Sequence, residues 1–153
     1  PLCIVLDNVR SLHNVGSAFR TADAFRIEKL HLAGITGTPP HREINKTALG
    51  ATESVDWEYH ADCAEAVKKL RSQGYIIIAV EQTTESIPLH QFVQQSDQKY
   101  CLVFGNEVNG ISETVLPYVH TAVEIPQVGT KHSLNVAVCL GIVVWEMSRR
   151  LFD

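Results

Sequence analysis

Two polar side chains interrupt an apolar helical pattern near the start of the chain. Asn14 and Arg20 stand six residues apart in the segment NVGSAFRTADAF. The planar guanidinium of Arg offers five N–H donors, a geometry that suits a phosphate or a carboxylate. A bound ligand would explain an Arg on an apolar stripe, and so would a snorkelling or salt-bridged side chain. The spacing alone leaves both interpretations open.

A second segment, LVFGNEVNGIS, runs from Leu102 to Ser112 and leads an apolar strand directly into polar residues. Gly105 has no Cβ, so its backbone can approach a ligand closely. Glu107 follows the end of the strand and could accept hydrogen bonds from a ligand or from Arg20. A tight strand-to-helix turn with an exposed acid is the alternative interpretation.

A third segment, EIPQVGTKHSLNVAV, runs from Glu124 to Val138 and leads from a strand through a loop into an apolar helix. Ser133 is a good N-cap for that helix, and the free N–H groups of a helix N-terminus can bind a carboxylate or a phosphate. Asn135 is polar in an otherwise apolar first turn. Capping by Ser133 and local hydrogen bonding by Asn135 would explain the same residues without a ligand.

The elements that must position these segments alternate between strand-like and helix-like patterns. Such alternation predicts a mostly parallel sheet with flanking helices, in which ligands bind at the carboxyl ends of the strands. Polar loops at 81–86, 105–110 and 126–133 leave those ends, and we expect them to form one site. Strands are expected at 2–6, 30–33, 75–80, 100–104 and 121–125, with an extended piece at 54–57. Helices are expected at 14–25, 44–49, 61–72, 113–116 and 133–150.

Length and composition fit one globular domain over residues 1–153, since 45% hydrophobic residues suffice for a packed core. No apolar run reaches the roughly 18 residues of a membrane span, so we expect no membrane segment. The four cysteines form no C-x-x-C pair, which predicts reduced thiols, a cytoplasmic location and no zinc site. The sequence also lacks the P-loop, dinucleotide-binding, zinc-protease and serine-hydrolase signatures.

The net charge of −4 is unfavourable for binding RNA, but the charge is unevenly distributed. Residues 1–50 carry six Lys or Arg against four Asp or Glu, whereas residues 51–153 carry seven against thirteen. The N-terminal part could therefore meet phosphates with a locally basic face. An ordinary mixed surface fits the same counts.

Taken together, the three segments closely resemble the SpoU, or TrmH-like, branch of the SPOUT methyltransferases. That family shows an N-x-x-x-x-x-R motif in its first third, then a G-x-E strand end, and last an I-P-x-x-G segment followed by S-L-N-V. All three occur here in that order. The resemblance extends from Leu2 to Arg150.

The resemblance implies an α/β fold whose parallel sheet carries a deep C-terminal trefoil knot, here within about residues 80–136. It also implies S-adenosylmethionine as the cofactor, no metal, and a homodimer in which the partner completes each active site. Part of the interface would lie on the C-terminal helix near residues 144–151. The implied reaction is 2′-O-methylation of an RNA ribose. The segment GYxIIxVEQT, at 74–83, is similar to enzymes that methylate a tRNA guanosine, and ribosomal RNA is the second choice.

Carried over residue by residue, the resemblance assigns two sets of site residues. The catalytic set is Asn14, Arg20, Glu107, Ser133 and Asn135. The cofactor set, which would act mainly through backbone groups, is Val80, Glu81, Gln82, Gly105, Asn106, Ile125, Gln127 and Leu134.

The role of Arg20 has two interpretations. It would act either as the general base or by holding the adjacent phosphate and the developing alkoxide, and a pKa above roughly 12 makes the second role physically easier. His41 and His132 are the other candidates for the base. Two other functions stay open for the whole chain, namely methylation of a guanine base at N1 and a cofactor-free RNA-binding module that keeps only the fold.

Overall fold

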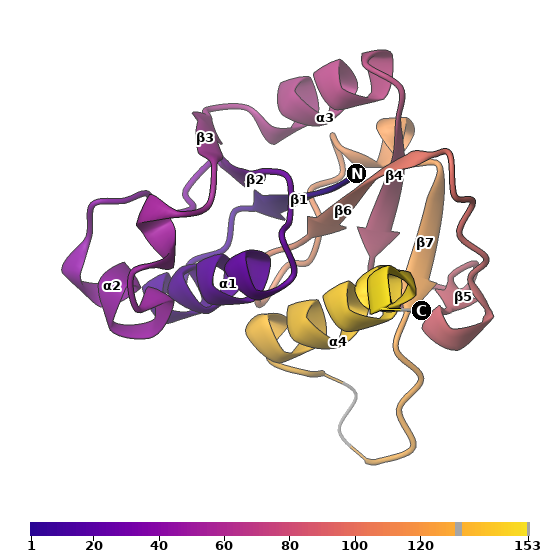
Figure 1. Cartoon of the computed structure of the whole chain (residues 1–153). Helices are drawn as coiled ribbons and strands as arrows, with labels where there is room; N and C mark the ends of the chain where they lie inside the picture. The colour runs from indigo at the N-terminus through magenta and orange to yellow at the C-terminus, as the bar shows by residue number, and fades with distance from the viewer. Residues whose placement is uncertain (131–132, 153) are drawn as a thin grey trace.

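Seven parallel strands form one sheet in the computed structural model, which describes residues 1–130 and 133–152 (Figure 1). Their order is β3-β2-β1-β6-β4-β7-β5, and all neighbouring strands pair in parallel. The mostly parallel α/β sheet expected from the sequence is confirmed. The strands are β1 (Leu2–Asp7), β2 (Leu30–Ala33), β3 (Trp57–His60), β4 (Tyr75–Val80), β5 (Ile87–Pro88), β6 (Lys99–Phe104) and β7 (Thr121–Glu124).

Helices cover both faces of this sheet. The described residues form α1 (Leu12–Ala24), α2 (Arg42–Ala48), α3 (Cys63–Ser72) and α4 (Val136–Ser148). Figure 1 shows α1, α2 and α4 on one face and α3 on the other. Each face has its own apolar core, the first including Phe19, Leu102 and Leu140, and the second including Val67, Ile77 and Val103. The central strands are buried on both faces, which explains their nearly continuous apolar sequences.

Helix α1 begins earlier than the pattern predicted, and α4 begins later. The Ser11 hydroxyl accepts the Asn14 N–H at 3.2 Å and caps α1. The prediction that Ser133 caps the last helix is wrong, because Asn135 takes that position and is an equally good capping residue. Its Oδ1 accepts the N–H groups of the two residues after Val136, at 2.8 and 3.4 Å. In the described part of the chain, no helix is both long and apolar enough to cross a membrane.

Two short elements were predicted wrongly. The helix expected at 113–116 is a turn followed by a 3-10 helix at Leu116–Tyr118, because the Ser112 hydroxyl donates to Asp7 at 3.0 Å and does not cap a helix. The extended piece expected at 54–57 is mostly a turn. The Ser54 hydroxyl holds this turn by donating to Asp23 at 2.8 Å, and the strand begins only at Trp57.

The strand order places β4 between β6 and β7, although both follow β4 in the chain. The chain therefore leaves β4 for the edge strand β5, returns to β6 on the other side of β4, and then crosses to β7. A trefoil knot in this region requires crossings of this kind. The knot itself stays a prediction.

Gly16 lies where α1 crosses α2. A Cβ at this position would lie 2.1 Å from Thr47 Oγ1 and 2.2 Å from the carbonyl oxygen of Ile44. Replacing Gly by Ala inside a helix normally stabilises it by about 1 kcal/mol. We predict that Gly16→Ala instead lowers the free energy of unfolding by about 2 kcal/mol, because the two helices must move apart. Urea unfolding measures this, with the neighbouring Ser17→Ala as the control, and an unchanged or raised stability of Gly16→Ala would contradict it.

Candidate active site

The carboxyl ends of β4, β6 and β7 lie side by side, and the loops that leave them enclose a cavity of about 320 Å³. This volume lies within the range of small-molecule sites. Three residues of the expected catalytic set line the cavity, namely Glu107, Ser133 and Asn135. The whole expected cofactor set also lines it: Val80, Glu81, Gln82, Gly105, Asn106, Ile125, Gln127 and Leu134. The loops thus meet as expected, and the binding role of each residue stays a prediction.

The loop after β6 is a tight turn held by Asn106. The backbone N–H of Asn106 donates to the carbonyl oxygen of Gly110 at 2.9 Å, and the Gly110 N–H donates to the Asn106 carbonyl oxygen at 3.0 Å. The side-chain oxygen of Asn106 accepts the N–H groups of Val108 and Asn109 at 2.8 and 3.0 Å. A Cβ on Gly105 would lie 2.3 Å from the Gly110 carbonyl carbon. Glycine is therefore required at 105 because the turn packs against itself, which is a different reason from the close approach of a ligand that the sequence suggested.

Glu107 connects this turn to the N-terminus of α1. One carboxylate oxygen accepts the Arg10 N–H at 2.8 Å. The other accepts the Ser11 N–H at 2.9 Å and the side-chain amide of Asn14 at 3.1 Å. These donors are its partners in place of the expected Arg20, which lies further along α1. Glu107 therefore fixes the helix of the first motif against the loop of the second.

The hydrogen bonds of this clamp favour the charged form of Glu107. Burial raises the pKa of this carboxyl, but the backbone N–H groups of Arg10 and Ser11 and the side chain of Asn14 lower it by more, so the net shift is downward. The carboxylate also lies at the N-terminus of α1, where the helix dipole stabilises negative charge. The clamp is therefore ionised at neutral pH.

Asn135 lines the cavity and caps α4 at the same time. Because its Oδ1 accepts the Ala137 and Val138 N–H groups, its Nδ2 is the group left to donate to a ligand. Ser133 and Leu134 line the same cavity from the irregular segment before the helix. The N-terminus of α4 thus borders the cavity as expected, with Asn135 as its N-cap.

Arg20 lies apart from the cavity. It is exposed on α1 and lines a separate depression between α1 and the turn that follows α2. His41 is also outside the cavity, where its Nδ1 accepts the Glu43 N–H at 3.0 Å and caps α2. His132 lies outside the described residues. Among the described residues that line the cavity, none is Arg, Lys or His.

The sequence analysis did not identify Asp7, which holds the segment after the 105–110 turn in place by hydrogen bonds. Asp7 is fully buried at the end of β1 and accepts the Ser112 N–H at 2.7 Å and its hydroxyl at 3.0 Å. The neighbouring Ile111 N–H donates to Glu81 at 3.2 Å. Together these acids hold the chain that leaves the 105–110 turn. An acid that ends the apolar run LCIVLD was the available signal for Asp7.

The model of the SpoU rRNA methylase family matches residues 1–145. The chain belongs to this family. It is 32% identical over 155 residues to a 23S rRNA (guanosine-2′-O-)-methyltransferase of Neisseria meningitidis serogroup B, covering 98% of this chain and 59% of that protein. It is 29% identical to a tRNA (guanosine(18)-2′-O)-methyltransferase of Thermus thermophilus, covering 97% of this chain and 75% of that protein.

A solved SpoU-like structure has the same fold. The AdoMet-bound rRNA methyltransferase from Sinorhizobium meliloti superposes with a TM-score of 0.91 at 27% identity, and the match covers 99% of this chain and 57% of that one. This chain therefore spans about three fifths of the length of the Neisseria and Sinorhizobium proteins.

We predict that Glu107→Gln lowers the free energy of unfolding at pH 7 by about 1 kcal/mol, a value discounted for the solvent exposure of the carboxylate. The folded-state pKa of Glu107 is lowered. Its charge therefore stabilises the fold above the unfolded-state pKa of about 4.3, and this stabilisation is lost as the pH falls through the lower folded value. The difference in free energy of unfolding between wild type and Glu107→Gln should therefore be smaller at pH 3 than at pH 7.

Urea unfolding at both pH values measures this difference. Glu113→Gln, which changes an exposed acid in the same segment, is the matched control and should change stability little at either pH. A Glu107→Gln effect of equal size at both pH values would contradict the clamp.

Proposed function

We propose that this chain is the catalytic domain of an S-adenosylmethionine-dependent methyltransferase that modifies the ribose 2′-hydroxyl of an RNA. The observation that carries the proposal is the cavity where the second and third motifs meet, with Glu107 tying the first motif to it. The names of the relatives support the same reaction, because both are guanosine 2′-O-methyltransferases. The Sinorhizobium methyltransferase is AdoMet-bound.

The lining of the cavity fits the chemistry of S-adenosylmethionine. Apolar side chains such as Ile125 and Leu134 can flank a base, and the carboxylates of Glu81 and Glu124 can accept hydrogen bonds from amino and hydroxyl groups. When bound, the cofactor supplies an electrophilic methyl group, so transfer needs no metal. The cavity residues then bind and orient it, and they exclude water from it.

Two copies of the chain share each active site in this proposal. Arg20 lies outside the cavity of its own chain, and no described residue of that cavity carries a cationic side chain. A second copy can supply the missing cation if its α1 lies across the cavity. Oligomers with two-fold symmetry place such a residue in both sites at once.

An apolar face suited to this association lies on α4. Val138, Ile142 and Trp145 repeat at helical spacing and are 52%, 40% and 50% exposed. The interface expected near residues 144–151 stays a prediction, since Val144 and Met147 are buried in the chain's own core but Trp145 and Leu151 are exposed. The exposed face begins earlier, at Val138, and continues beyond the helix to Phe152.

Within a shared site, Arg20 of the second copy would hold the phosphate beside the target ribose. Its guanidinium would also stabilise the alkoxide that develops as the 2′-hydroxyl loses its proton. A role as general base suits it less, because an Arg pKa above roughly 12 keeps the side chain protonated. Asn135 Nδ2 borders the cavity and is available to orient the ribose.

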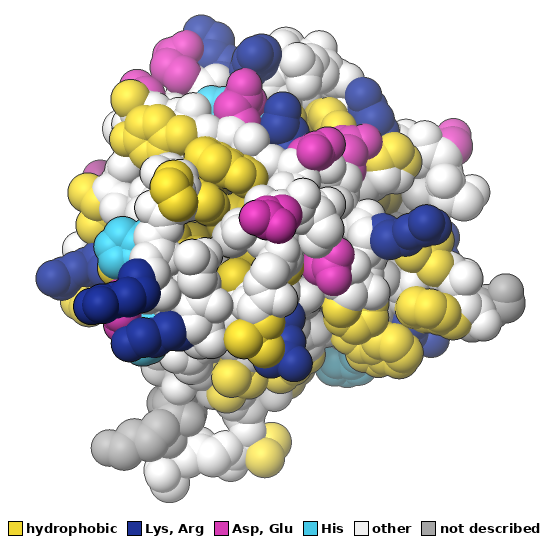
Figure 2. All heavy atoms as spheres, turned by 60° about the vertical axis from the view of Figure 1, so that its left-hand side comes forward, with side chains coloured by type: hydrophobic (Ala, Val, Ile, Leu, Met, Phe, Trp, Pro, Cys, Tyr) yellow, Lys and Arg dark blue, Asp and Glu magenta, His cyan; other side chains and the backbone are white. Residues whose placement is uncertain are grey.

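The face that carries α2 and the start of α1 is the proposed RNA contact. Arg10, Arg42 and Lys46 are exposed there. Figure 2 shows one group of Lys, Arg and His side chains at the left edge of the view, with other Lys and Arg side chains scattered over the rest of it. Glu43 balances part of this charge by pairing with Lys46 at 2.9 Å and with His13 at 3.1 Å. The chain's own positive surface is therefore modest.

We propose tRNA as the substrate, ribosomal RNA as the second choice, and the cytoplasm as the location.

We predict that Arg20→Ala abolishes methyl transfer and leaves the affinity for S-adenosylmethionine nearly unchanged. Arg20 lies outside the cavity of its own chain, and in the shared site it would contact the RNA and not the cofactor. Arg20→Lys should not restore transfer, because a point charge cannot replace the planar fork. Calorimetric titration with the cofactor, in the presence of a chelator, and a transfer assay measure the two effects. Residual turnover above about a tenth of wild type would mean that Arg20 lowers the barrier by less than about 1.4 kcal/mol, and His41 or His132 would become the candidate base.

Mixed dimers test whether the site is shared. Arg20→Ala keeps its cavity intact, and Asn135→Ala keeps its Arg20, so neither variant alone should be active. If Arg20 acts across the dimer, unfolding and refolding the two together should restore about a quarter of wild-type turnover, since half of the dimers then hold one complete site of two. No recovery in a mixture shown to contain mixed dimers would contradict sharing.

The substrate and the position of the methyl group can be read from one assay. Total RNA incubated with cofactor carrying a tritiated methyl group should acquire label in the tRNA fraction, and nuclease digestion should place the label on a ribose. Label confined to large ribosomal RNA would select the runner-up substrate. Label on guanine would indicate the base-methylating branch, and RNA binding without any label would indicate a non-catalytic module.

A further inference from the structure

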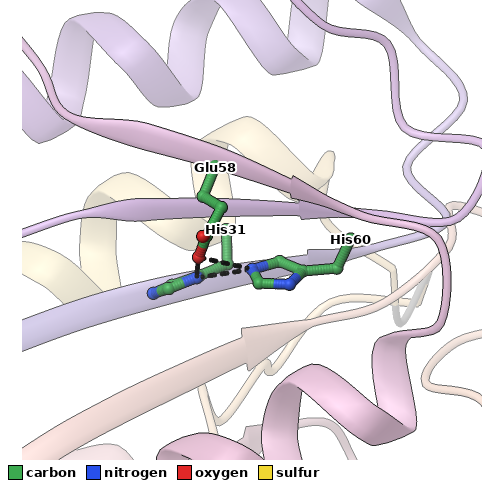
Figure 3. Close-up of side chains that lie close together, drawn as sticks. All are labelled: His31, Glu58 and His60. Carbon is green, nitrogen blue, oxygen red and sulfur yellow. Dashed lines mark hydrogen bonds and ion pairs between the residues drawn. The ribbon is translucent and has the colours of Figure 1, made fainter.

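Two His and one Glu meet at the β3 edge of the sheet. His31 on β2 pairs in register with Glu58 on β3, and His60 lies two residues after Glu58 on the same strand. Side chains alternate along a strand, so Glu58 and His60 point to the same face, and residues in register point to the same face as each other. Figure 3 shows the three side chains converging from the two strands.

The distances between the three donor atoms are close to those between three ligands of a tetrahedral zinc ion. His31 Nδ1 lies 2.9 Å from His60 Nε2, and Glu58 Oε2 lies 3.2 Å from His60 Nε2 and 3.8 Å from His31 Nδ1. Donors bound tetrahedrally to zinc at about 2.0–2.1 Å lie about 3.3 Å from one another. A triangle with the observed edges has a point about 2 Å from all three corners, so the three donors are close enough together to share one ion.

The groups around the cluster affect the charge of its side chains. Burial and the neighbouring His60 lower the pKa of His31 to about 4, and burial also lowers the pKa of His60. The 2.9 Å contact between His31 Nδ1 and His60 Nε2 is a hydrogen bond, so one of these two nitrogens carries a proton that zinc would displace. The Lys29 ammonium lies 3.8 Å from the same Glu58 oxygen, and its side chain is 38% exposed, so it can turn to solvent when a cation binds.

We propose that His31, Glu58 and His60 bind one zinc ion, with a fourth position open to water. Two imidazoles and a carboxylate are a donor set that zinc uses in proteins, whereas magnesium and calcium prefer oxygen ligands alone. The Glu58 side chain is 43% exposed, so solvent can reach the open position. The expectation of no zinc site rested on the absence of ligands at motif spacing in the sequence, whereas this cluster is assembled by the register of β2 and β3.

The zinc ion would hold the edge strand to the sheet and take no part in methyl transfer. All three ligands come from β2 and β3, and β1 separates these strands from β6, the nearest strand of the cavity. Because the unfolded chain does not hold the three donors together, binding energy adds to folding stability. Zinc should therefore raise Tm and leave the affinity for S-adenosylmethionine unchanged.

The test uses the whole chain, freed of any histidine tag and stripped of metal by dialysis against a chelator. Calorimetry with zinc should show one ion per chain with a Kd of about 10 µM or tighter, and Tm should rise when zinc is added. Cobalt in place of zinc should give the visible absorption of a tetrahedral or five-coordinate ion. Absence of zinc binding by the wild-type chain would overturn the proposal.

Variants locate the ion. Glu58→Gln keeps the size of the side chain, and His60→Ala removes a partly exposed ligand, so each should weaken zinc binding by about tenfold or more while circular dichroism shows an intact fold. His13→Ala is the matched control, because His13 also pairs with a Glu at 3.1 Å but, among the described residues, belongs to no three-ligand group. Wild-type zinc affinity in both ligand variants, or loss only in His13→Ala, would place the ion elsewhere and overturn the proposal.

Discussion

A single carboxylate holds the two ends of the candidate site together. Glu107 accepts hydrogen bonds from three residues that are more than 90 positions away in the chain. The contact is possible because β1 and β6 are neighbours, so α1 and the turn after β6 leave the sheet at the same edge. The clamp thus adds polar contacts to the apolar packing of α1, which already places the first motif beside the cavity.

Carboxylates elsewhere around the cavity also bind backbone or hydroxyl donors. Asp7 accepts the N–H of Ser112, and Glu81 accepts the N–H of Ile111. The hydroxyl of Ser86 donates to Glu124 at 2.8 Å. This use bears on how a chain with a net charge of −4 could bind the proposed RNA substrate. Several acids near the site are directed inward to protein donors, so their charge is partly neutralised by hydrogen bonding before a phosphate approaches.

The sequence predicted most of the elements, because apolar periodicity is a local signal. It also predicted the meeting of the three loops, because the carboxyl ends of parallel strands share one side of a sheet. The apolar stripe of α1, with Val15, Ala18 and Phe19, is buried as predicted. The partners of polar groups could not be predicted in the same way. Whether Ser112 caps a helix or binds Asp7, and whether Glu107 meets Arg20 or Arg10, depends on contacts between residues far apart in the chain. Asn135 and Ser133 were both sound caps, and the structure alone distinguishes them.

The two edges of the sheet limit how copies of this chain can associate. A parallel sheet exposes unpaired backbone groups at each edge, and a second chain can extend it there. Here one edge is β5, only two residues long and ending in Pro88, which has no N–H to donate. The other edge, β3, is four residues long and carries Glu58 and His60. Strand addition is therefore disfavoured at both edges, which leaves the helical surfaces, including the proposed α4 face, as the more favourable places for a second copy to pack.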